Sequence, residues 1–229
     1  MKAAPLLMTA GLLMTTLTAC SGSEAPPQKL TASEQLSAAR AKVEQAKSMH
    51  LTLRSSGIPP SANGVLSADG DGTPAPAFKG TLDARIAGFQ AKVEVVAIGT
   101  LLYLKLPFTT EFAQVDPKEY NAPNPAQLFA TQGGITSLMT TTTNPVEGEK
   151  SRLGADVLVT ITGKLPGDKV ASLLSIGDAA KTYDVTYGIT DPGGELRSVT
   201  LVGPFHKGAT STYTLTLDKY GAPVEISKP

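Results

Sequence analysis

The sequence predicts an α+β domain in which one large antiparallel β-sheet packs helices against one of its faces. Apolar and polar residues alternate in about eight to ten short runs that Gly and Pro separate, as in strands that bury a single face. One longer segment near the N-terminus instead follows the period of a helix. A sheet covered by helices on one side buries both kinds of apolar face in one domain.

The chain begins with a predicted secretory signal peptide, residues 1–19. Lys2 gives it a positive start, and the uncharged run that follows is shorter than the ~20 residues of a membrane-spanning helix. The single cysteine comes next, in the stretch Leu17-Thr18-Ala19-Cys20, and has no second cysteine to pair with. This stretch resembles the bacterial lipobox, which implies cleavage before Cys20 and lipidation of its thiol. Residues 20–30, rich in Ser and Pro, then form a lipidated, flexible tether.

A helix is predicted over residues 31–50, at the start of a single domain that occupies residues 31–229. Thr31 can cap this helix, and Glu34 three positions later completes a capping box. Its apolar residues recur three and four positions apart and so share one stripe: Leu36, Ala39, Val43 and Ala46.

Four alternating runs, at residues 49–55, 80–88, 89–99 and 100–106, predict an antiparallel meander. Residues 65–78 predict a short strand and a turn, and the Asp-Gly-Asp-Gly stretch from Asp69 to Gly72 is interpreted as a hairpin turn. The side chains on the apolar side of these runs are small or aliphatic. Such a face either packs as an ordinary core or encloses space.

The second half of the chain predicts short helices at residues 125–130, 135–140 and 165–177, with a polar loop from Thr140 to Thr143. Strands are predicted at residues 155–163, 181–190, 195–203, 211–219 and 222–229. The stretch Asp-Pro-Gly-Gly-Glu at residues 191–195 predicts a hairpin turn between two of them.

Composition argues against several classes of protein. The chain has 20 Lys and Arg against 20 Asp and Glu, so it offers no basic field for nucleic acid. With Cys20 lipidated no cysteine remains, and stability must come from an apolar core instead of disulfides. Because the chain has no Trp and only 5% aromatic residues, that core is expected to be aliphatic.

Catalytic and metal sites are not expected. The two histidines, His50 and His206, are interpreted as surface residues, and no Gly-x-Ser-x-Gly stretch accompanies them. A calcium loop starting at Asp69 would need Glu twelve positions in, where the chain has Gly80. Two histidines without a free cysteine make zinc a poor fit. The sequence therefore predicts no enzyme and no cofactor.

Beyond these patterns, nearly the whole chain after residue 20 resembles the LppX/LprG/LprA/LprF group of mycobacterial lipoproteins. Members often carry Trp where this chain has Tyr187 and Tyr220. The matching pieces run in order from Cys20 to the C-terminus: CSGS, AKSMHLTL, GIPP, GTLLYLKL, PAQLF, GGITSLM, ITGKL, ELRSVTL and TLTLDKYGAPVEISKP.

The resemblance implies a half-barrel, a curved antiparallel sheet with helices on its concave face and an apolar cavity between them. Small inward side chains suit such a cavity, because a carrier must not fill its own interior. The alternating runs place these residues on its wall: Leu82, Ala84, Ile86, Ala91, Val93, Val95, Leu102, Leu104, Val157 and Val159.

The same resemblance implies a cell-envelope lipoprotein on the outer face of the cell membrane. Its cavity would bind acylated lipids or glycolipids and carry them between the inner membrane and the outer envelope, with an efflux-type membrane transporter as a partner. The alternative is a scaffolding lipoprotein that binds an envelope protein and has no ligand. An enzyme acting on envelope lipids or glycans is the third hypothesis.

The lipobox yields a direct test of the anchor. Cys20→Ala removes the thiol that would carry the diacylglyceryl group, so the variant should accumulate unprocessed or be released from the membrane while its fold remains intact. Fractionation after a carbonate wash measures this. A variant that still fractionates with the membrane as the parent does would refute the anchor assignment.

Overall fold

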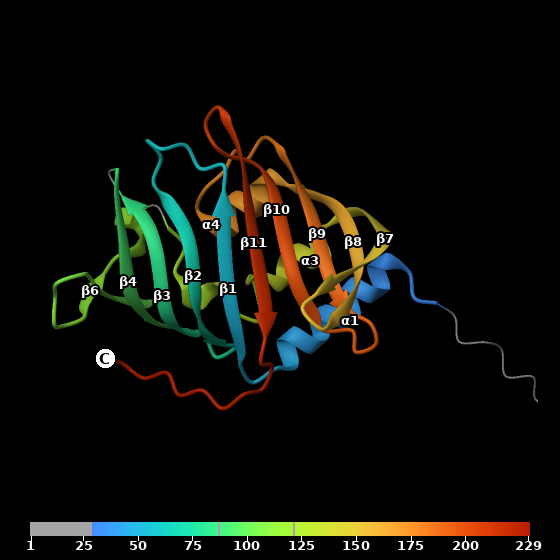
Figure 1. Ribbon diagram of the computed structural model, residues 1–229, viewed down its shortest axis with the longest axis horizontal. Helices are drawn as coiled ribbons and strands as arrows, with labels where there is room; N and C mark the ends of the chain where they lie inside the picture. The colour runs from blue at the N-terminus through green and yellow to red at the C-terminus, as the bar shows by residue number, and fades with distance from the viewer. Residues whose placement is uncertain (1–28, 87, 121) are drawn as a thin grey trace, which may run out of the picture.

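The computed structural model describes residues 29–229 except 87 and 121, so the predicted signal peptide and Cys20 lie outside the described residues. One antiparallel sheet of eleven strands forms the body of the molecule, and helices lie behind it in the view of Figure 1. The strands adjoin in the order β6-β5-β4-β3-β2-β1-β11-β10-β9-β8-β7. The predicted architecture of a curved antiparallel sheet with helices against one face is therefore confirmed.

The elements have the following bounds. The strands are β1 Met49–Ser56, β2 Gly64–Thr73, β3 Ala77–Ile86, β4 Phe89–Ile98, β5 Leu101–Lys105, β6 Ala113–Val115, β7 Thr143–Leu153, β8 Asp156–Pro166, β9 Thr182–Thr190, β10 Leu196–His206 and β11 Ala209–Asp218. The helices are α1 Ala32–Gln45, α2 Pro125–Leu128, α3 Thr136–Thr141 and α4 Gly167–Leu174, with a 3-10 turn η1 at Pro117–Tyr120.

Helix α1 begins as predicted and ends earlier than predicted. The Thr31 hydroxyl accepts a hydrogen bond from the Glu34 backbone N–H, and the Glu34 carboxylate accepts one from the Thr31 N–H, which completes the capping box. The buried stripe comprises Leu36, Ala39 and Val43. The helix ends at Gln45 because Ala46 adopts an extended backbone and the chain enters β1 three residues later.

The two halves of the sheet meet where β1 pairs with β11, and one apolar row crosses this junction. In each strand from β8 to β4, the residue at this level faces the helices and pairs with its apolar neighbours on the adjacent strands. The row consists of Ile161, Tyr187, Val199, Leu215, Leu53, Ala68, Leu82 and Val93. We call the face that carries this row the concave face.

The core is mainly aliphatic, as expected, but it also contains aromatic rings that contact one another. Tyr183, Phe205 and Tyr213 form a chain of ring contacts, with centroids 4.8 and 4.7 Å apart. Phe78 stacks on Phe129 with centroids 5.9 Å apart. Half of the Phe and Tyr residues of the chain therefore belong to the buried core.

The Asp69 to Gly72 stretch is strand, and its interpretation as a hairpin turn is wrong. It lies within β2, whose register pairs Gly70 with Gly80 and Gly72 with Phe78 on β3. A Cβ on Gly72 would lie 2.3 Å from the Phe129 ring, and a Cβ on Gly70 would lie 2.7 Å from the Phe78 ring. These glycines therefore make room for the stacked rings.

Three further predictions need correction. Eleven strands replace the eight to ten expected, since β6 and β7 were missed. Strand β7 lacks alternation because it is an exposed edge strand that carries charges, a usual protection against edge pairing. The threonines predicted as a loop instead end α3 and start β7. Residues 222–229 are no strand; Gly221 N–H donates to Ser48 O, and the tail runs on until Lys228 lies 5.7 Å from the Tyr103 ring.

The fit between Gly72 and Phe129 predicts a sensitive position. Gly72→Ala should destabilise the fold by about 1–3 kcal/mol, because the new methyl group overlaps a packed ring. A domain of this size then loses about 2–4 °C of melting temperature per kcal/mol. Gly148→Ala on β7 is the control, because its Cβ would meet only the Thr160 carbonyl oxygen at 3.8 Å. Equal melting temperatures for the two variants would contradict this packing.

Candidate functional site

The most distinctive feature of the concave face is a ladder of five apolar cross-strand pairs on β3 and β4. Every residue of the ladder lacks a polar side-chain atom. From the α2 end of the strands to the hairpin tip, the pairs are Phe78–Ala97, Gly80–Val95, Leu82–Val93, Ala84–Ala91 and Ile86–Phe89. We call this set the β3–β4 ladder.

Exposure rises steadily along the β3–β4 ladder. Phe78 is 1% exposed and Val93 is 5% exposed, whereas Ala84 and Ala91 are only partly buried. At the tip Ile86 reaches 40% and Phe89 reaches 79% exposure. The ladder thus leads from the closed core to solvent without leaving apolar surface.

Helix α2 closes only one end of this ladder. It contacts β3 and β4, and Phe129, which directly follows it, stacks on Phe78. The Asn124 side chain caps α2 by accepting a hydrogen bond from Ala126 N–H at 3.0 Å, and its amide donates to Gly99 O in the β4–β5 turn. The helix is therefore fixed beside the β4–β5 turn, at the end of the ladder opposite the β3–β4 tip.

Strand β5 extends the apolar surface sideways. Leu102 pairs with Ala97 and is buried, and Leu104 pairs with Val95 and is partly buried. The other face of the strand carries Tyr103, which is also buried but lies outside the main core cluster.

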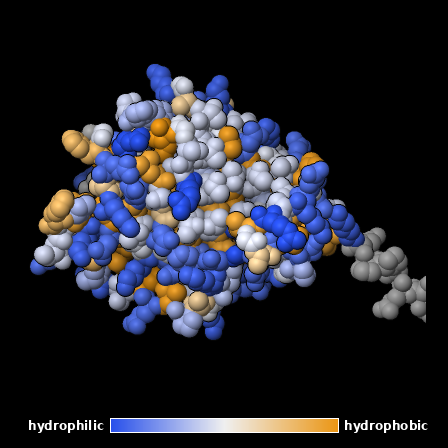
Figure 2. All heavy atoms as spheres, in the orientation of Figure 1, coloured by the Kyte–Doolittle hydropathy of each residue, from blue (hydrophilic) through white to orange (hydrophobic). Residues whose placement is uncertain are grey.

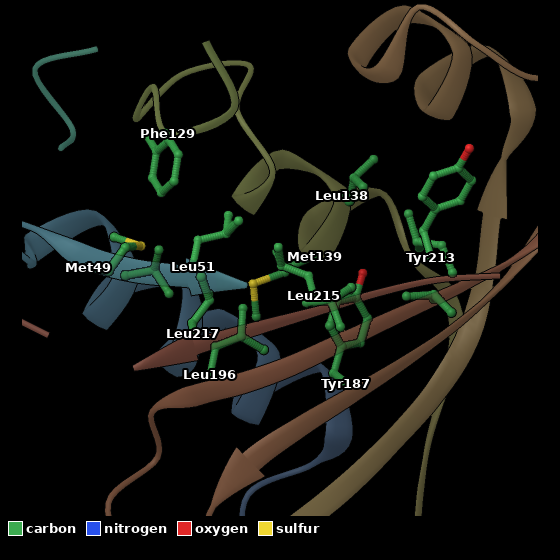
Figure 3. Packing of buried hydrophobic residues seen from close by; sticks show 14 of the residues in the cluster. Met49, Leu51, Phe129, Leu138, Met139, Tyr187, Leu196, Tyr213, Leu215 and Leu217 are labelled. Atoms are coloured by element: carbon green, nitrogen blue, oxygen red, sulfur yellow. The ribbon is translucent and has the colours of Figure 1, made fainter. Parts of the chain in front are cut away.

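The opposite half of the concave face is covered by three helices. Helix α1 contacts β7 and β10, α3 contacts β8, and α4 contacts β8 and β9. Figure 3 shows Leu138 and Met139 of α3 on the same side of the sheet as Leu215 and Tyr187. The Tyr187 hydroxyl lies 2.8 Å from the Thr142 hydroxyl, and burial raises the pKa of Tyr187 well above its usual value. This half is a packed core.

The residues predicted to line a cavity thus divide into four groups. Val93, Val95 and Leu102 are buried in the core, and Leu82, Ala91, Leu104 and Val159 pack against it half-buried. Ala84 and Ile86 lie toward the open tip. Val157 is half-buried near the start of β8. Strand β8 lies in the other half of the sheet from β3 and β4, so the structure does not bring Val157 and Val159 together with the other eight.

Two hollows lie at opposite edges of the sheet. One of about 560 Å³ is an open hollow bordered by the β4–β5 turn, β6, η1 and α2, with Leu101, Val115 and Gln127 among its lining residues. The other, of about 370 Å³, lies between α1, β7 and the end of β9. Val159 borders the second hollow, and no other residue predicted to line a cavity borders either one.

The two histidines are more enclosed than predicted. His50 faces away from the core as expected, but its Nδ1 lies 2.9 Å from Asp71 Oδ1, and its side chain is 15% exposed. His206 belongs to the end of β10 and its Nε2 lies 3.2 Å from the Tyr213 hydroxyl. Burial lowers the pKa of His206 and raises the pKa of Tyr213 to about 12. Each histidine thus contacts a side chain of the neighbouring strand, an arrangement that suggests structural roles.

Among residues 29–229 without 87 and 121, no three His, Cys, Asp or Glu side chains come together as metal ligands do. No helix in this part of the chain is long and apolar enough to cross a membrane.

Sequence reasoning missed several residues of the site. Phe89 is the outermost member of the ladder, and Phe78 with Phe129 closes its inner end. The glycines of β2 were the available signal, because a glycine inside a strand indicates that something approaches the backbone closely. Which ring approaches is decided only by the pairing of β2 with β3.

Comparisons with known proteins agree with this architecture. The model of the LppX_LprAFG lipoprotein family matches residues 31–226. LprF from Mycobacterium bovis superposes with a TM-score of 0.70 at 17% identity, over 86% of this chain and 96% of that one. LppX from Mycobacterium tuberculosis superposes with a TM-score of 0.65 at 21% identity, over 86% of this chain and 98% of that one.

A comparison with curated protein sequences finds no match. The two solved structures share less than a quarter of their residues with this chain, so they establish the fold and leave the ligand to be argued from the residues. The family match covers all the described strands and helices. The chain belongs to the LppX_LprAFG lipoprotein family.

Proposed function

We propose that the protein is a carrier that holds the acyl chains of lipids or glycolipids against the β3–β4 ladder. The observation that carries this proposal is the gradient of exposure along the ladder, from buried Val93 to open Phe89. Acyl chains could enter at the tip and advance along apolar surface. Cargo would pass between the inner membrane and the outer envelope, with an efflux-type transporter as a candidate partner.

The chemistry of the ladder suits acyl chains better than polar ligands. None of its side chains offers a hydrogen bond, so a polar ligand would lose its water contacts without replacement. An acyl chain needs only apolar burial, and ten buried methylenes would contribute roughly 8 kcal/mol before the cost of immobilisation. The head group would then remain at the mouth, beyond Ile86 and Phe89.

A lipid anchor at Cys20 complements this proposal. Membership in a lipoprotein family and the lipobox together support processing before Cys20. The protein would then be held on the outer face of the cell membrane, where its cargo is. We propose no catalytic chemistry, because both histidines have structural partners.

A scaffolding function is the second candidate. The exposed side chains at the tip of the ladder would also suit an apolar protein partner. In that case the gradient of exposure would be a docking surface with no cargo, and protein purified from its own envelope would contain no lipid.

Ala91→Trp tests the carrier. The indole would lie on the half-buried part of the ladder and occupy the path of an acyl chain, while the open tip leaves room for it. Bound lipid, measured by native mass spectrometry, should be lost, and the melting temperature should stay within about 2 °C of the parent.

Lys92→Trp is the matched control, because Lys92 is the next residue of β4 and points to the opposite, exposed face. This variant should keep its lipid. The carrier proposal would be refuted if Ala91→Trp retained its bound lipid, or if the parent protein carried no lipid.

A further inference from the structure

Exposed apolar side chains gather at the tips of two neighbouring hairpins. Ile86 and Phe89 flank the β3–β4 turn, and Leu106 and Phe108 lie in the β5–β6 loop. Leu106 is 50% exposed and the Phe108 side chain is fully exposed. Figure 2 shows hydrophobic atoms at the left edge of the molecule, over these two tips. We call these four residues the apolar tips.

The backbone of the β5–β6 loop holds Phe108 outward. Phe108 has φ of 69°, a left-handed conformation that is costly for a residue with a side chain. The N–H and the hydroxyl of Thr109 both donate to Leu106 O, at 3.2 and 2.8 Å, and close the turn around it. The strained turn therefore presents the Phe108 ring to solvent, where it contributes nothing to the core.

The charges around the apolar tips are balanced. Lys105 pairs with Glu94 at 3.1 Å and lies 6.0 Å from the Phe112 ring. Arg85 donates to Pro59 O, and the Gln90 amide donates to Asp83. Among the described residues near the tips, positive charge does not exceed negative charge, so binding there would be driven by apolar burial and not by charge.

The tether enters the domain at the opposite edge of the sheet. Lys29 Nζ lies 2.6 Å from Glu147 on β7, whereas the apolar tips belong to β3–β6 at the other edge. Ten spacings of roughly 4.8 Å separate the outer strands along the curve of the sheet, about 48 Å in all. The nine residues from Cys20 to Lys29 reach at most roughly 30 Å. In Figure 1 the β7 edge and the tips lie at opposite ends of the long axis.

We infer that the apolar tips are a membrane-contact surface that inserts into a second lipid surface, one other than the membrane that holds the anchor. The tether is shorter than the sheet is wide, so an upright domain carries its tips away from the anchoring membrane. The tips continue directly into the β3–β4 ladder, and an acyl chain leaving a bilayer there would pass onto the ladder without meeting water. The inference rests on the proposed carrier function and adds the surface that the carrier touches.

The absence of Trp from the chain permits a direct test. The full lipidated protein is anchored in donor vesicles of phosphatidylcholine as the Phe108→Trp or Phe89→Trp variant, each a ring-for-ring change at an exposed site. Acceptor vesicles contain phosphatidylcholine with brominated acyl chains, which quench indole on contact. Acceptor vesicles should quench both variants at least about twofold, because inserted apolar groups lie about 5–10 Å into the headgroup and acyl boundary.

Val146→Trp is the matched control. Val146 is also apolar and is 60% exposed, but it lies on β7 at the tether edge. Acceptor vesicles should leave its emission unchanged. Quenching of the tip variants only when the brominated lipid is in the donor vesicles would overturn the inference, since the tips would then rest on the anchoring membrane. No quenching in either arrangement would also overturn it, and a protein partner would then account for the tips.

Native mass spectrometry of the same variants separates this inference from the carrier. Bound lipid without quenching would refute the membrane contact and leave the carrier standing. Quenching of Phe108→Trp in protein that never holds lipid would support the contact and refute the carrier. Phe89→Ser combined with Phe108→Ser should reduce capture of unbrominated acceptor vesicles without lowering the melting temperature, because both side chains are exposed. Undiminished capture by this double variant would count against the contact.

Discussion

The structure depends on a register that keeps one apolar row in line across eight strands. Because side chains alternate along a strand, a slip of one residue anywhere in the row would turn that strand's apolar side chains to solvent. The pairing of Leu53 on β1 with Leu215 on β11 is the critical link, since it joins the two halves of the chain. The helices, the rings of Tyr183, Phe205 and Tyr213, and the β3–β4 ladder all pack on the face that carries this row.

Uneven covering of this row gives the molecule two different halves. Three helices and three contacting rings fill the space over β8–β11, and Gly203 has its Cβ position occupied by the Tyr183 ring. Over β3 and β4, the covering comes from α2 and from Phe129 at one end. One half is therefore a packed core, and the other leaves apolar surface exposed. A carrier needs both, because a sheet that is open along its whole length would lose the burial that holds it together.

The point where the chain enters the domain and the open end of the ladder lie near opposite edges of the sheet. The chain enters at the β7 edge, where Lys29 pairs with Glu147, and the ladder opens near the other edge. The long exposed edge strand β7 carries Glu149, Lys150 and Arg152, charges that discourage pairing with another strand. Apolar exposure is concentrated instead at the hairpin tips. An anchored domain with this layout has its apolar opening far from its point of attachment.

The sequence by itself determined the elements whose signal is local. The alternation of β1, β3, β4 and β5, the capping box of Thr31 and Glu34, and the lone Cys20 after an apolar run all depend on neighbours within a few residues. The residues predicted for the cavity wall do share one face, because period-two alternation assigns faces without any knowledge of pairing. The pairing alone places Val157 and Val159 of β8 apart from the eight on β3, β4 and β5. Whether they line a cavity stays a prediction.

Only the tertiary structure decided how much of that face the helices cover and which side chains pack against the glycines of β2. Gly70 and Gly72 looked like a turn because the rings of Phe78 and Phe129 that require them are remote in sequence or on another strand. Strand β7 escaped notice because an edge strand exposed on both faces has no alternation to detect. The exposure of Phe89 and Phe108 likewise depends on which strands the helices cover. The pairing of strands across the sheet determines which strands those are.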